Sequence, residues 1–237
     1  MDNASLGNDS LSRYLQWAIN NISSTRQHNG KRFSQCVRLD QAFETAFRNF
    51  SDFEECALLA PLLFRSWHTF RGSCMMVMSG QAAEAYILMR GCLEAAMYAL
   101  HIEINPDLRM IWLNRDKDPE SRNACINRFQ QRKVAKTLQD KSKWLSEIAT
   151  QLYEHTIDLG AHPNKRSATD CLEIDTDVEN KTLTMRYEVG RPDQITDAWE
   201  ATCHVGACAL HIMQLARPDY FKRLEIDAML DEITKEL

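Results

Sequence analysis

Apolar residues recur at helical spacing along most of the chain. Near the start, Leu11, Leu15, Ala18 and Ile22 share one helix face, and Ser10 can cap that helix. The segment 81–101 is apolar around most of its circumference, which predicts a central, buried helix. The same reasoning predicts further helices over about 35–50, 51–79, 106–114, 119–137, 141–159, 194–216 and 218–233.

One segment departs from this pattern. Leu172, Ile174 and Thr176 alternate with polar residues, and so do Leu183 and Met185. The turn-forming residues 179–181 separate the two runs, which predicts a β-hairpin near 172–189. The predicted fold is therefore an all-α, multi-helix bundle with one small β-hairpin insertion. Because Asn29-Gly30 interrupts the first helical pattern, we expect an N-terminal helix and linker over 1–34 and a single helical domain over 35–237.

Composition narrows the class of protein. The chain has 237 residues, of which 44% are hydrophobic and 26% charged, which favours neither disorder nor a membrane protein. No signal-peptide pattern is visible at the start, and the eight cysteines include no CxxC pair. We therefore expect a cytoplasmic protein with reduced, mostly buried thiols.

The net charge of −5 means that nucleic-acid binding would need a local basic patch. The candidate is the stretch from Arg122 to Lys143, in which Arg128 and Arg132 are i,i+4 neighbours on a predicted helix, with Lys136 next in the row. A solvated helix face is the competing interpretation, since such faces are common.

Polar residues on the 81–101 helix form a first candidate site. Arg90, Glu94 and His101 point in one direction at 3.6 residues per turn. A buried arginine needs a partner, and Glu94 is the natural one for Arg90. Such a pair can fix the helix register, or Arg90 can face a cleft and bind phosphate.

A second candidate lies at the end of the 141–159 helix. His155, Asp158 and His162 have i, i+3 and i+7 spacing, and Pro163-Asn164 follows. Such a face can hold a divalent metal, place a general base beside a carboxylate, or be a structural polar cluster. Because the residue before a proline avoids the α region, we expect His162 to leave the helix axis.

A third stripe combines Glu200, His204, Cys208 and His211 on one side of the 194–216 helix. These ligand types suit zinc, but the rest of the helix is apolar, so packing explains the pattern equally well. The sequence contains no GxGxxG, P-loop, GxSxG or HExxH motif, and we predict no cofactor.

Two segments carry a family resemblance. The run AYILMRGCLEA at 85–95 resembles the LLRSLLEA helix of HEPN-like bacterial proteins, a group that includes a family of unknown function. The stretch from Tyr153 to Asn164 is similar to the later helix of that group, where an aromatic residue leads to a histidine followed by a small or polar residue. The resemblance covers about 50–165 and implies a dimeric helical bundle with an RNA-related role.

The resemblance does not extend to the nuclease motif. HEPN ribonucleases place an arginine four to six residues before a histidine and cleave RNA across a dimer without metal. Here no histidine has an arginine at that spacing. If chemistry persists, we expect Arg90, paired with Glu94, to stabilise a phosphate and His162 to act as the acid–base group. His101, His155, Asp158, Asn164, Arg128 and Arg132 are the candidate binding residues.

The sequence leaves three functional hypotheses open. The leading one is a HEPN-like protein that binds RNA or a protein partner, or is a divergent metal-independent ribonuclease, in bacterial defence or stress. The second is a non-enzymatic dimeric interaction module held by structural ion pairs. The third is a metal-dependent enzyme.

Overall fold

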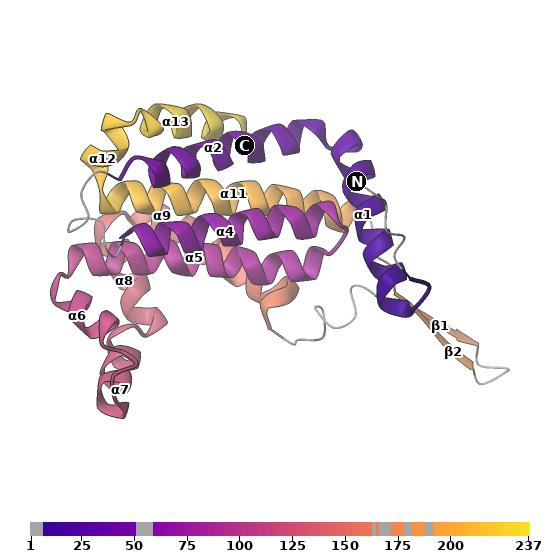
Figure 1. The fold of residues 1–237 in the computed structure, drawn as a ribbon, viewed down its shortest axis with the longest axis horizontal. Coiled ribbons are helices and arrows are strands. Elements are labelled where there is room, and N and C mark those ends of the chain that lie inside the picture. The colour runs from indigo at the N-terminus through magenta and orange to yellow at the C-terminus, as the bar shows by residue number, and fades with distance from the viewer. Residues whose placement is uncertain (1–6, 51–58, 163–164, 166–171, 178–181, 188–191) are drawn as a thin grey trace.

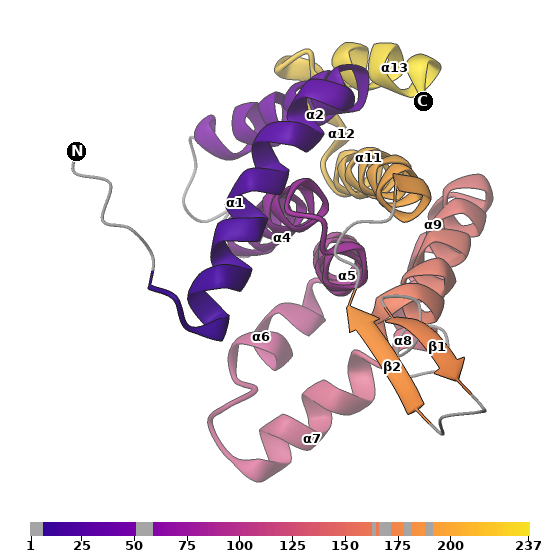
Figure 2. The same cartoon turned by 90° about the vertical axis from the view of Figure 1, so that its right-hand side faces the viewer.

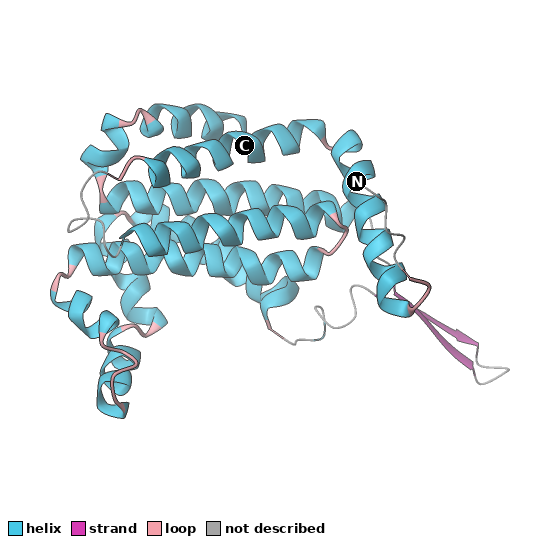
Figure 3. Ribbon diagram, in the orientation of Figure 1, coloured by secondary structure: helices cyan, strands magenta, loops and turns pink. Residues whose placement is uncertain are grey.

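The computed structural model describes residues 7–50, 59–162, 165, 172–177, 182–187 and 192–237 (Figure 1). The helical class predicted from the sequence is confirmed, as Figure 3 shows. The helices are α1 (Ser10–His28), α2 (Gly30–Arg48), α4 (Leu59–Met78), α5 (Ala82–Ile104), α6 (Asp107–Leu113), α7 (Pro119–Arg128), α8 (Gln131–Lys141), α9 (Lys143–Thr156), α11 (Pro192–Ala216), α12 (Pro218–Arg223) and α13 (Ile226–Glu236). The π-helix η1 (Ile157–Ala161) continues α9.

Helix α5 is the centre of the bundle, as its apolar circumference predicts. It packs against α4, α11, α8, α9 and η1, and Figure 2 shows it beside α4 and α11 in the end view. Alanines such as Ala85, Ala96 and Ala99 are buried on it and let neighbouring helices approach closely. Helices α2, α4 and α11 supply much of the rest of the core, including the fully buried Phe43, Phe70 and Trp199.

The prediction of a single helix over 119–137 is wrong, because the segment forms two helices, α7 and α8. Helix α7 ends at Arg128, and the Gln130 backbone is extended (φ −59°, ψ 136°) before α8 begins at Gln131. Phe129 at this break is buried against Tyr98, with ring centroids 5.1 Å apart, and against His101. Because Arg128 and Arg132 lie on different helices, their predicted i,i+4 relation is wrong, whereas Arg132 and Lys136 keep that spacing on α8.

The N-terminal helix is attached through its polar side chains. Asp9 rather than Ser10 caps α1, with its carboxylate accepting the Ser12 N–H at 3.0 Å. Tyr14 donates to the Gln81 side chain, and α1 contributes no buried residue to the core. Helix α2 begins at Gly30, so most of the expected linker is helical. The division at residue 34 stays a prediction.

Two short strands follow η1 in the chain. β1 (Leu172–Asp177) and β2 (Thr182–Tyr187) pair antiparallel, from Leu172 opposite Tyr187 to Asp177 opposite Thr182. Figure 1 shows the pair extending away from the helices, and its role as an insertion stays a prediction. The predicted turn at 179–181 lies outside the described residues. Among the described helices, none combines the length and apolar content required to cross a membrane.

We expect Gly206→Ala to destabilise the fold, because a Cβ at this position of α11 would lie 2.6 Å from the ring of buried Phe70. Overpacking of this kind costs about 1–3 kcal/mol in unfolding free energy, measurable by urea denaturation. Gly30→Ala is the matched control, since its Cβ would meet nothing within 4 Å. A Gly206→Ala variant as stable as wild type would contradict the close approach of α11 to α4.

Candidate functional site

The predicted pair of Arg90 and Glu94 is present on α5, and a third residue completes it. Arg90 Nε donates to Glu94 Oε1 at 2.8 Å, and both side chains are half-buried. The Tyr153 hydroxyl from α9 donates to the same Glu94 oxygen at 3.0 Å. The Arg90 guanidinium also lies 5.0 Å from the centroid of the Tyr153 ring. The cluster therefore links α5 to α9.

Electrostatics keep this cluster in one protonation state near neutral pH. Burial and the neighbouring Glu94 carboxylate raise the pKa of Tyr153 to about 12, so its hydroxyl remains a donor. Burial lowers the pKa of Arg90, but the Glu94 carboxylate outweighs it and the net shift is upward. Arg90 is therefore a permanent cation whose charge already has a carboxylate partner. That arrangement favours a structural clamp over an open phosphate site.

His162 lies further along the chain from this cluster. The α9–η1 segment runs antiparallel to α5, so His155 lies against Tyr86 and Gly160 against Ala83. A Cβ on Gly160 would be 2.1 Å from the Ala83 carbonyl oxygen. Ala83 is seven residues before Arg90, about 10 Å along the helix. The structure thus places Tyr153 beside Arg90. His162 instead follows Gly160, which packs near the N-terminal end of α5.

The helix end around His162 has two features that the sequence suggested only in part. His162 has an extended backbone (φ −133°, ψ 142°) and is exposed, which confirms that it leaves the helix axis. However, Asp158 falls within the π-helix, whose wider turn disrupts the assumed i, i+3, i+7 alignment with His155. Asn164 lies outside the described residues. Across the described ranges, no three His, Cys, Asp or Glu side chains gather closely enough to hold a metal ion.

His101 has a packing environment of its own. It is buried, with Nδ1 2.7 Å from Thr137 Oγ1 and Nε2 3.3 Å from the Arg128 carbonyl oxygen. Burial lowers its pKa, so the neutral ring is favoured. His101 therefore ties α5 to the end of α7 and to the middle of α8.

The polar stripe on α11 is spread over separate contacts. Glu200 forms an ion pair with Arg32 of α2, and Cys208 is buried. His211 contacts Gln214 of its own helix and, through Nε2, Thr234 Oγ1 of α13 at 3.1 Å, whereas His204 is exposed. This stripe therefore contributes to packing between helices.

The basic segment presents its charge to solvent. Its seven cations against a single carboxylate give residues 122–143 a net charge of +6, so the remainder of the chain carries −11. All seven side chains are exposed: Arg122, Arg128, Arg132, Lys133, Lys136, Lys141 and Lys143. Figure 1 shows α7 projecting from the body of the bundle. The break between α7 and α8 thus leaves the cations exposed on two helices, with Lys143 following as the first residue of α9.

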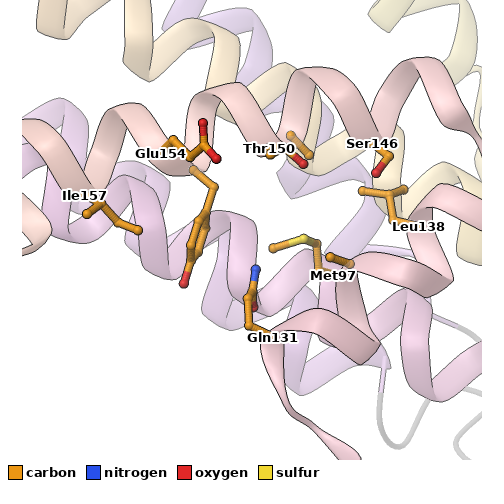
Figure 4. A pocket seen from close by; sticks show the side chains of 10 residues that line it. Met97, Gln131, Leu138, Ser146, Thr150, Glu154 and Ile157 are labelled. Atoms are coloured by element: carbon orange, nitrogen blue, oxygen red, sulfur yellow. The ribbon is translucent and has the colours of Figure 1, made fainter.

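A pocket of about 280 Å³ lies beside these cations, between α5, α8 and α9 (Figure 4). Its lining is mainly apolar and includes Met97, Leu138 and Ile157. Polar groups at its wall come from Gln131, Ser146, Thr150, Tyr153 and Glu154. Sequence reasoning missed this pocket because helix periodicity does not show where two helices diverge.

Comparisons with known proteins add no assignment. No protein family, curated protein or solved structure matches the chain. The HEPN-like resemblance therefore stays a prediction based on the two short segments alone.

We expect Tyr153→Phe to lower the unfolding free energy by about 1 kcal/mol, because it removes a hydrogen bond to a half-buried carboxylate. Glu94→Gln weakens the same cluster, so the double variant should lose less than the sum of the single losses. Tyr14→Phe combined with Glu94→Gln is the control, since Tyr14 bonds Gln81 instead. Additive losses for Tyr153 and Glu94 in urea denaturation would exclude the coupling.

Proposed function

We propose that this chain is a HEPN-like helical protein that binds RNA through the exposed cations of α7 and α8. The observation that carries the proposal is the concentration of a +6 charge in residues 122–143 of an otherwise acidic chain. RNA phosphates attract such a patch, and binding gains free energy from the release of condensed counterions. The charge of the remaining chain disfavours polyanion contact elsewhere and thereby orients the encounter.

The cations are available for such contacts. Lys136 and Lys143 form i,i+4 ion pairs with Asp140 and Glu147, at 3.2 and 4.0 Å. Exposed pairs of this kind contribute about 0–1 kcal/mol, so phosphate can displace the carboxylates at little cost. Arg132 Nε donates to Gln130, which leaves its other guanidinium nitrogens as further donors.

RNA binding has more support than RNA cleavage. In the ribonuclease hypothesis, Arg90 stabilises a phosphate and His162 exchanges protons, which requires both at one reacting centre. The contacts around Arg90 instead come from Glu94 and Tyr153. A bacterial defence or stress role and a homodimer follow from the resemblance and stay part of the proposal.

A non-enzymatic interaction module is the second candidate function. It is favoured by the use of polar stripes on α5 and α11 in contacts between helices, such as Glu94 with Tyr153 and Glu200 with Arg32. In that case the basic face binds an acidic protein partner rather than RNA.

The test is fluorescence anisotropy with a labelled single-stranded RNA over 50–200 mM salt. We expect Arg122→Gln/Arg128→Gln/Arg132→Gln to weaken binding by roughly tenfold or more at low salt. Loss of three phosphate contacts should also reduce the slope of log K against log salt by about 2. Lys31→Gln/Lys222→Gln/Lys235→Gln is the matched control, because it removes three exposed cations on α2, α12 and α13.

Equal losses for the two triple variants, or no RNA binding by the wild type, would overturn the proposal. Gel analysis of the same mixtures separates binding from cleavage. RNA that stays intact supports a binding role, whereas cleavage abolished by His162→Ala would restore the ribonuclease hypothesis.

A further inference from the structure

We infer that the pocket between α5, α8 and α9 receives one unstacked base of a bound RNA strand, with adenine as the preferred base. This inference rests on the proposed RNA-binding function and adds a base-recognition site to it. The position, shape and chemistry of the pocket each support it.

The pocket lies directly on the path of the basic face. Gln131 at its wall is the first residue of α8 and precedes exposed Arg132 and Lys133. A second hollow of about 280 Å³ shares Ser146 and Thr150 with the first and includes Lys143. Arg132 and Lys133 therefore follow the pocket wall on α8, and Lys143, which pairs with Glu147, lies at the adjoining hollow. A backbone that runs between these cations would pass the pocket.

The size and lining of the pocket suit a flat ring. Its volume of about 280 Å³ is at the lower end for ligand sites, which favours a small planar group over a large cofactor. Met97 and the Tyr153 ring supply apolar and aromatic surface. The Tyr153 hydroxyl is bonded to Glu94, which holds the ring in place for stacking. Single-stranded RNA is recognised in this way, through bases splayed out and stacked on aromatic side chains.

The side-chain carboxamide of Gln131 would form the hydrogen bonds that recognise the base. Figure 4 shows it across the pocket from Ser146 and Thr150, on the same side as Met97. Its carboxamide offers a donor and an acceptor together, the combination that pairs with the edge of adenine. The exposed position of Gln131 permits substitution without disturbing the core.

Two variants test the pocket with short oligoadenylate as the probe. Gln131→Leu removes the edge contacts, and Thr150→Trp fills the pocket from an exposed position. We expect each to weaken oligoadenylate binding about fivefold to tenfold, within the range known for loss of one stacked base. The salt slope and the affinity for an oligonucleotide with abasic sites should stay unchanged. Gln41→Leu, exposed on α2, is the control.

The outcomes separate this inference from the proposed function. Wild-type oligoadenylate affinity in both variants, with the normal salt slope, would overturn the pocket while leaving RNA binding intact. Equal wild-type affinity for oligoadenylate and abasic RNA would do the same. Absence of RNA binding by the wild type would overturn both.

Discussion

The burial of α5 is the constraint on which the rest of the structure depends. Because neighbouring helices cover most of its surface, each polar side chain on it needs a partner from another element or from its own next turn. Glu94 accepts from Arg90 and Tyr153, and His101 contacts Thr137. Near the C-terminal end, the side chain of Glu103 is only 7% exposed and lies between Arg109 and Arg217. Apart from the Arg90–Glu94 pair within α5, each contact ties a different part of the chain to this helix.

Polar side chains in this protein fall into two groups: those paired between helices and those exposed to solvent. The paired groups on α5 and α11 hold helices together, and removing one partner would leave a partly buried charge without its partner. The cations of α7 and α8 face solvent instead, where phosphate can reach them. The pocket beside Gln131 connects the two regions, since Tyr153 belongs both to the α5–α9 contact and to the pocket lining. The contact of Tyr153 with Glu94 thus also positions the Tyr153 ring in the proposed base-binding pocket.

Sequence periodicity predicted most helices but missed the breaks that tertiary packing creates. Residues 119–137 carry a continuous helical pattern, yet the helix is interrupted between Arg128 and Gln131, where Phe129 is buried against Tyr98. The pairing of Arg90 with Glu94 was predictable because both lie on one helix at i,i+4. Tyr153 is 59 residues from Glu94, and no local pattern indicates that contact.

By itself, the sequence determined the helical class, the apolar faces that form the core, and the strong local charge of residues 122–143. These properties follow from the spacing and chemistry of neighbouring residues. Only the tertiary structure decided which residues meet across helices. The register of α9 and η1 against α5 depends on the close approach of Gly160 to Ala83, a contact between segments distant in the chain. That register places Tyr153 beside Arg90. One segment alone could not predict it, because the packing of two helices depends on the shapes of both surfaces.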